Sequence, residues 1–345
     1  MLAAVLGALG GMPGLRPAEA GEFTRRAFEG GKMDLAETEA LADLLDADTA
    51  SQRRQALRGL DHGIGQKADT WREKLIEALA LAEAEIDFPD EGDVPVGLTG
   101  RAHQIAACLA DELRAALAQS GGERLREGAV VVIAGPPNAG KSSFLNRVAR
   151  REVAIVSPHA GTTRDMIEVA VDLGGYPATF IDTAGLRETA DPVEQEALRR
   201  ARDRASRADL VLWFEAPDAI GAPDASGDVP VWRVRNKSDL APVPGLEGFT
   251  ISALSGDGVS PLLSAMEVWL RDVFEPGESA LITRARHRTA LTEALSHLDE
   301  AGRQALPELF AEELRLSGRA LGRISGRVDV EHVLDSIFLS FCIGK

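Results

Sequence analysis

Apolar positions in the first part of the chain recur at helical spacing. Asp34 stands where a helix N-cap is expected, Glu37 follows three residues later, and leucine and alanine then repeat every three or four residues as far as Leu60. The same spacing returns over 67–86, which ends in the acidic stretch IDFPDEGDVP, and over 101–119, which ends in a glycine pair. The pattern predicts three amphipathic helices.

The pattern changes after Gly128, where the continuous apolar run AVVVIAG begins. Such a short run is typical of a strand that is buried on both faces of a parallel sheet. Helical stretches separate most of the later strand candidates, an alternation that predicts a doubly wound, mostly parallel α/β sheet. These further candidates are 167–173, 178–181, 210–214, 230–235 and 249–251.

Helical spacing returns over 284–303 and 306–342, with Gly322 and Gly326 as expected joints. The simplest architecture is therefore an α/β domain inserted into an all-α helical domain. The bounds we predict are 1–22 for the remnant of an N-terminal domain, 23–126 and 276–345 for the two parts of the helical domain, and 127–275 for the inserted domain.

Composition and charge limit the partners. The chain has 345 residues and a formal net charge of -16, so its surface as a whole repels nucleic acid and an RNA partner needs a local basic patch. Cys108 and Cys342 provide neither metal-ligand spacing nor a disulfide framework, which favours a reducing cytoplasm. The N-terminal apolar run lacks a basic region and is shorter than the roughly 20 residues that span a bilayer, so we expect no membrane association.

The segment GPPNAGKS at 135–142 follows the buried strand directly and matches the phosphate-loop pattern. Glycines let the backbone close around phosphate oxygens, Lys141 would reach the β and γ phosphates, and the Ser142 hydroxyl would coordinate magnesium. The alternative is a glycine-rich turn with an incidental lysine. The strand before the loop and the amphipathic FLNRVA after it favour the phosphate loop.

Further motifs follow in the order expected of a site for GTP. A threonine of GTTRD at 161–165 can supply a second magnesium ligand, and the carboxylate of DTAG at 182–185 can act on the second shell of the metal. In NKSD at 236–239, Asp239 can accept both hydrogens from guanine N1 and N2, a donor pair that adenine lacks. A backbone amide of SAL at 252–254 can meet the guanine oxygen.

Two catalytic roles need other groups than in many switch GTPases. Leu186 stands where those proteins carry a glutamine that orients water. Glu194, farther along the same loop, is a candidate for that role, and an equally good interpretation is that it caps the following helix. No arginine finger is assignable, and the amide oxygen of Asn138 could instead hold a monovalent cation against the phosphates.

The residues quoted resemble the MnmE (TrmE) family of tRNA-modification GTPases over essentially the whole chain. The marks are AGEFTRRAFEGGKMDLAETEALADLLDA, EAEIDFPDE, GPPNAGKSS, GTTRD, DTAGLRE, NKSD and the C-terminal FCIGK. The resemblance implies an inserted GTPase domain that pairs with a second copy, is stimulated by potassium and positions water with Glu194. It implies magnesium ligands at Ser142 and Thr163, and potassium contacts at Asn138, Ser157, His159 and Thr162.

The resemblance also implies a role in modifying carbon 5 of the wobble uridine, U34, of certain tRNAs by carboxymethylaminomethyl or aminomethyl addition. The implied partners are the flavoprotein MnmG (GidA) and a one-carbon unit on 5-formyl- or methylene-tetrahydrofolate, with folate contacts at Lys32 and Lys345. The family's folate-binding and dimerising domain precedes the AGEF segment. Almost all of it is missing here, so we expect weakened folate binding and a homodimer formed only through the GTPase domains.

The residues that we expect to contact GTP or GDP are Asn138, Ala139, Gly140, Lys141, Ser142, Ser143, Ser157, Thr162, Thr163, Asp182, Thr183, Ala184, Gly185, Asn236, Lys237, Asp239, Ser252, Ala253 and Leu254. One rival interpretation is a ribosome-assembly GTPase, which would usually bring a basic RNA-binding domain or a second GTPase domain. The other is a non-enzymatic scaffold gated by nucleotide. Cys342 is either a reactive thiol or a small buried residue at a helix end.

Overall fold

The computed structural model describes residues 2–87, 98–119, 121–150, 155, 168–182, 206–221, 229–240, 248–275 and 280–327. The chain divides into two compact units. The helical unit comprises Met1–Ala47, Arg53–Glu123 and Ser279–Lys345, and the sheet unit comprises Asp48–Gln52 and Arg124–Glu278. The chain thus leaves the helical unit, forms a sheet, and returns, which is the arrangement of an inserted domain.

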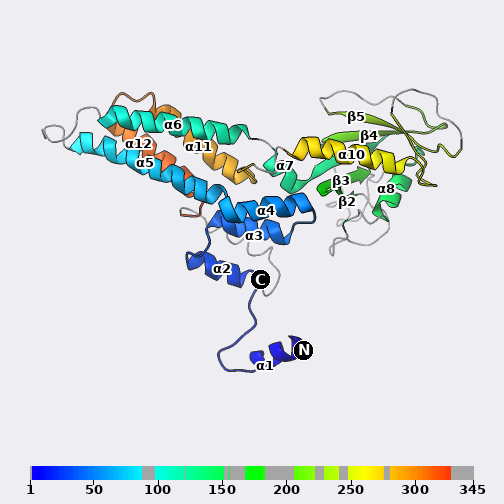
Figure 1. The fold of residues 1–345 in the computed structure, drawn as a ribbon, viewed down its shortest axis with the longest axis horizontal. Helices are drawn as coiled ribbons and strands as arrows, with labels where there is room; N and C mark the ends of the chain where they lie inside the picture. Colours follow the sequence, from blue (N-terminus) through cyan, green and yellow to red (C-terminus); the bar gives the residue numbers. More distant parts are fainter. Residues whose placement is uncertain are drawn as a thin grey trace, which may run out of the picture. The chain divides into compact units, whose positions relative to one another are not determined.

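Four long helices of the helical unit pack side by side as a bundle (Figure 1). Alanines at the facing positions allow close approach, while Trp71, Leu113 and Phe310 fill the remaining space and are fully buried. Their bounds are α5 (Ile64–Asp87), α6 (Leu98–Ala118), α11 (Ala285–Ala301) and α12 (Pro307–Gly322). The sequence predicted the first three to within a few residues. Of the fourth, predicted over 306–342, the start was right, but α12 ends at Gly322, one of the two expected joints, and 328–342 lie outside the described residues.

The segment predicted as one helix from Asp34 to about Leu60 forms two helices, so that prediction was wrong. The start was right: the Asp34 side chain accepts from the Glu37 amide, and the Glu37 side chain accepts from the Asp34 amide. The first helix ends at Leu45, with Asp46 as its C-cap, and the Gln52 side chain accepts from the amides of Asp48 and Thr49. Thr49 Oγ1 in turn accepts from the Gln52 amide. Side chains thus compete with the helical backbone here, a local effect that the apolar spacing hides.

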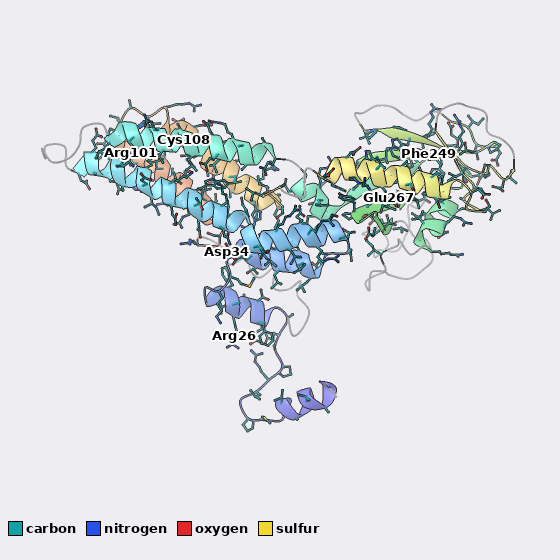
Figure 2. The ribbon with its side chains drawn as sticks, in the orientation of Figure 1. Arg26, Asp34, Arg101, Cys108, Phe249 and Glu267 are labelled. Atoms are coloured by element: carbon teal, nitrogen blue, oxygen red, sulfur yellow. The ribbon has the colours of Figure 1, made fainter. Side chains whose placement is uncertain are left out.

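The N-terminal helices of the helical unit are short. Burial raises the pKa of Asp34, at the start of α3, to about 6, because the charged carboxylate loses solvent there (Figure 2). The bounds of these short N-terminal helices are α1 (Leu2–Gly10), α2 (Glu22–Glu29), α3 (Leu35–Leu45) and α4 (Ala50–His62).

A buried charge network centred on Glu39 of α3 ties this helix to the start of α11. Arg286 donates to both carboxylate oxygens of Glu39 at 2.5 Å, and His287 Nε2 lies 2.9 Å from the same carboxylate. Arg286 also donates to the carbonyls of Arg323 and Ile324, just after α12. Burial would raise the pKa of Glu39, but the hydrogen bonds from His287 and Arg286 outweigh it and lower this pKa to about 2.

Among the described residues, six strands form one sheet in the order β2-β3-β1-β4-β5-β6. All neighbours are parallel except β2 and β3, which form an antiparallel pair. This confirms the doubly wound, mostly parallel sheet. The strands are β1 (Ala129–Ala134), β2 (Glu168–Leu173), β3 (Tyr176–Asp182), β4 (Leu210–Glu215), β5 (Val231–Arg235) and β6 (Phe249–Thr250).

Helices pack against this sheet and complete its core, in which Phe144, Phe180 and Phe214 are fully buried and their rings touch. The bounds of the helices are α7 (Gly122–Glu127), α8 (Lys141–Ala149) and α10 (Val259–Phe274). Because β1, β3, β4 and β5 are parallel, the loops that follow them all leave the same edge of the sheet. The phosphate loop follows β1, Asp182 ends β3 and NKSD follows β5, while SAL follows β6, which is parallel to β5. GTTRD and the rest of DTAG lie outside the described residues.

No helix in the described part of the chain is long and apolar enough to cross a membrane.

Candidate functional site

The loop between β1 and α8 needs residues that tolerate a left-handed backbone. Gly135 has a φ of 134°, and a Cβ there would lie 2.2 Å from the Phe214 carbonyl oxygen. Asn138 has a φ of 64°, a conformation that asparagine adopts more readily than most side chains. Gly140, at φ 89°, leaves room for the Asn236 amide, which would lie 2.1 Å from a Cβ. The motif glycines therefore permit a close approach of neighbouring loops as well as the turn itself.

Lys141 begins α8 and folds back over the loop. Its Nζ donates to the carbonyls of Gly135 and Pro136 at 2.8 Å each, and its side chain is buried. The ammonium group therefore lies against the first carbonyls of the loop, and the N-terminus of α8, which favours an anion, closes the same loop. Both features fit a phosphate chain.

Ser142 and Asp182 come from different elements and meet at the end of β3. Ser142 Oγ donates to Asp182 Oδ2 at 2.6 Å, and Asp182 is 2% exposed. A hydroxyl that can ligate a hard cation, backed by a buried carboxylate, is a donor set suited to magnesium held jointly with phosphate oxygens. The residues present therefore fit the metal, with Ser142 as a ligand and Asp182 behind it.

Asn236 joins the base-recognition loop to the phosphate loop. Its Nδ2 donates to the carbonyl of Ala139 at 2.9 Å, and its Oδ1 accepts from the amide of Ala253 at 2.8 Å. Only 2% of the residue is exposed. Asn236 therefore connects three loops that are far apart in sequence: the phosphate loop, its own NKSD loop and the SAL loop. These contacts are a structural reason for an asparagine at the first position of NKSD.

Asp239 is exposed, and its Oδ1 accepts from the Ser252 hydroxyl at 2.5 Å. Ser252 is fully buried, so the hydroxyl orients the carboxylate from behind and leaves its outer side open. The arrangement can present a directed pair of acceptor oxygens to a base with two adjacent N–H groups, which is the pattern of guanine.

A family model described as the MnmE helical domain matches residues 35–342 of this chain. A tRNA modification GTPase MnmE of Rhodopseudomonas palustris (strain BisB5) is 56% identical over 372 residues, covering 100% of this chain and 81% of that protein. The chain belongs to the MnmE family of tRNA modification GTPases. A relative of the same name from Bradyrhizobium sp. (strain BTAi1 / ATCC BAA-1182) is 56% identical over 349 residues, covering 98% of this chain and 78% of that protein.

One solved structure similar to this MnmE chain is Era in complex with MgGDPNP and nucleotides of 16S ribosomal RNA. It is 25% identical and covers 41% of this chain and 56% of its own. Its TM-score of 0.29 is too low to carry an argument about function. The resemblance to MnmE seen in the motifs is confirmed by the family model and by the full-length relatives.

The structure brings together the part of the predicted MnmE nucleotide site that lies on described residues: the phosphate loop with Ser142 and Ser143, Asp182, and the two base-recognition loops. Lys32, predicted to contact folate, is exposed after α2 in the helical unit. Cys108 is exposed on α6 (Figure 2). The predicted residues that lie outside the described ones are Ser157, His159, Thr162, Thr163, Thr183, Ala184, Gly185, Glu194, Cys342 and Lys345.

Sequence reasoning missed two residues at the base-recognition end, Asp218 and Arg147. Asp218 pairs with Lys237 of the predicted NKSD motif: Nζ of Lys237, whose φ is 63°, lies 2.8 and 2.9 Å from the two Asp218 oxygens. The hydrogen bond from Lys237 lowers the pKa of Asp218 and keeps it charged. Arg147 of α8 contacts the loop that follows β6. Neither residue stands in a recognised motif, so no pattern in the sequence indicates it.

Proposed function

We propose that this MnmE chain is a magnesium- and potassium-dependent GTP hydrolase that is activated when two GTPase domains pair. We further propose that it takes part in adding a carboxymethylaminomethyl or aminomethyl group to carbon 5 of the tRNA wobble uridine, U34, with a flavoprotein partner, MnmG. As a member of its family the chain is a GTP-hydrolysing enzyme. The observation that best supports the nucleotide part is the bridge from Ala139 through Asn236 to Ala253.

The bridge matters because it sets the separation between two ends of a ligand. Ala139 belongs to the phosphate loop, and Ala253 to the loop beside Asp239. A ligand that reaches both must carry phosphates at one end and a base at the other. Asp239 then selects guanine, since a carboxylate facing adenine would lack both of its donors.

Potassium is proposed to compensate for the unassigned arginine finger. Asn138 is exposed within the phosphate loop and has a left-handed backbone, and its side chain carries an amide oxygen that can ligate a cation. A cation held there would neutralise charge that develops during phosphoryl transfer. The proposed further contacts at Ser157, His159 and Thr162, the magnesium ligand Thr163 and the water-positioning Glu194 rest on the family resemblance.

We expect GTP turnover to be several-fold faster in potassium than in sodium, with Asn138→Ala abolishing the difference. The reason is that the smaller sodium ion holds its hydration shell more tightly and fits a site of carbonyl and amide oxygens less well. Steady-state phosphate release at matched ionic strength is the measurement. Asn146→Ala, on an exposed position of α8, is the matched control and should retain the potassium effect.

Equal rates in the two salts for the unchanged protein would contradict the potassium site. The same preparation can be followed by light scattering with GDP and aluminium fluoride in potassium. Pairing of GTPase domains predicts a dimer under that condition and a monomer without nucleotide.

The tRNA part of the proposal has its own test. In cells that lack their own MnmE, this chain should restore C5-modified uridine at the wobble position, measured by mass spectrometry of nucleosides from purified tRNA. Removing the flavoprotein from the same cells should abolish the modification, because the flavin of that partner would carry out the redox chemistry. Unmodified U34 beside full GTPase activity of the purified chain would contradict it, and dependence on a one-carbon tetrahydrofolate would support contacts at Lys32 and Lys345.

A further inference from the structure

Arg147 spans from the phosphate-loop helix to the loop that reads the base. Its Nε donates to the carbonyl of Ala253 at 2.5 Å, and its Nη2 donates to the carbonyl of Leu254. Gly256, at φ 99°, makes room for this guanidinium, because a Cβ there would lie 2.7 Å from Nη1. The planar fork of an arginine suits two successive carbonyls, and each bond is strengthened by the positive charge.

These two bonds determine the direction of amides on the other side of the loop. A trans peptide unit is planar, so its C=O and the N–H of the next residue point in opposite directions. Holding the Ala253 carbonyl therefore orients the amide of Leu254, and holding the Leu254 carbonyl orients the amide of Ser255. The Ser255 amide donates to Ser252 Oγ at 3.0 Å, which closes the turn.

The other amides of the loop already have acceptors inside the protein. The amide of Ser252 donates to the Asp257 carbonyl at 2.9 Å, and that of Ala253 donates to Asn236 Oδ1. Within the described residues, the structure records no acceptor for the amide of Leu254. A base oxygen would therefore take the Leu254 amide, or share the Ala253 amide with Asn236.

We propose that Arg147 is a positioning residue for base selectivity, acting through residues 252–255 on the oxygen at carbon 6 of guanine. Asp239 reads the N1 and N2 hydrogens, and Ser252, which donates to that carboxylate, belongs to the same turn. Arg147 thus keeps two groups aligned: the backbone amide that would donate to the guanine oxygen, and the Asp239 carboxylate that would accept the N1 and N2 hydrogens. This role rests on the proposed guanine site and adds a residue that none of its motifs contains.

Arg147→Met tests the role by removing the guanidinium while keeping an unbranched side chain on α8. Affinities for GDP, for 6-thio-GDP and for inosine diphosphate are measured by calorimetry. The first analogue replaces the oxygen at carbon 6 by sulfur, a weaker acceptor, and the second lacks the 2-amino group that Asp239 reads. We expect GDP affinity to fall about fivefold to tenfold, the factor for ordering roughly one backbone residue.

The selectivity pattern separates positioning from general support. In Arg147→Met the ratio of GDP to 6-thio-GDP affinity should fall toward one, while the ratio of GDP to inosine diphosphate affinity should stay as in the unchanged protein. Arg150→Met, at the exposed end of α8, is the matched control and should alter neither ratio. Arg147→Lys, whose ammonium is a point charge without the fork, should give an intermediate ratio, and it decides the matter if the methionine variant does not fold.

Unchanged selectivity in both Arg147 variants would overturn the proposal, and so would an equal loss for all three nucleotides, which indicates only structural support. The guanine site itself is tested separately by the unchanged protein. If that protein binds GDP no better than ADP, the proposed function fails. If it prefers GDP but the Arg147 variants keep the same selectivity, only the proposed role of Arg147 fails.

Discussion

Asp239→Asn should weaken GTP binding more than tenfold. We propose that the carboxylate accepts two hydrogen bonds from guanine. Hydrogen bonds to a charged group contribute about 1.5–3 kcal/mol each, and the neutral amide would retain only a part of that. Its position is already set by the Ser252 hydroxyl at 2.5 Å, so the substitution leaves the supporting geometry in place. Isothermal titration calorimetry with GTP and magnesium measures the change directly.

The same substitution should strengthen the binding of xanthosine triphosphate. Xanthine carries a carbonyl where guanine carries the 2-amino group, so the asparagine amide can donate to it while accepting from N1. Asp239→Asn should therefore bind the xanthine nucleotide better than the unchanged protein does. Asp272→Asn, on an exposed position of α10, controls for a general effect of one lost charge. Unaltered GTP affinity in Asp239→Asn would contradict the assignment of the base site.

Glu39→Ala should destabilise the helical unit by about 3–5 kcal/mol, the usual cost of breaking a buried ion pair from one side. Glu39 is 2% exposed, and its loss leaves the Arg286 guanidinium and the His287 imidazole without their shared acceptor. Urea unfolding followed by circular dichroism measures the loss. Glu73→Ala, on an exposed position of α5, is the matched control and should change stability little.

The pH dependence of this effect has a defined sign. The pKa of Glu39 lies at about 2 in the folded protein against an ordinary value of 4.5, so its stabilisation is full above pH 4.5 and is lost as the pH falls toward 2. Burial lowers the pKa of His287, so acid below its ordinary value of 6.5 favours the unfolded chain as well. The stability difference between the unchanged protein and Glu39→Gln should therefore shrink between pH 5 and pH 3. A difference that stays constant over this range would contradict the assigned pKa of Glu39.

Local patterns accounted for the strands and for most helices. Strand β1 was predicted from AVVVIAG alone, because a strand buried on both faces must be apolar at every position. The break between α3 and α4 was missed for a related reason. Apolar residues keep helical spacing across the break, and the Thr49 and Gln52 side chains that bond the backbone there leave that spacing unaltered.

Much of the proposed nucleotide site lies in short motifs, because the residues that would act on one chemical group are adjacent in sequence. A phosphate loop uses consecutive amides and the lysine that follows them, and this needs a short motif of defined composition. Asp182, the last residue of β3, and the NKSD motif, which begins directly after β5, could be placed because parallel strands bring such ends to one edge of the sheet.

The sequence alone predicts the mostly parallel sheet, the helices that precede and follow it along the chain, and the motifs of the phosphate and base loops. The side chains that support these loops become known only from the three-dimensional fold. Asn236 meets Ala139 across 97 positions, Arg147 meets Ala253 across 106, and Glu39 meets Arg286 across 247. Such pairs depend on the order of strands and the packing of helices, and a periodic pattern carries no information about partners that lie so far apart along the chain.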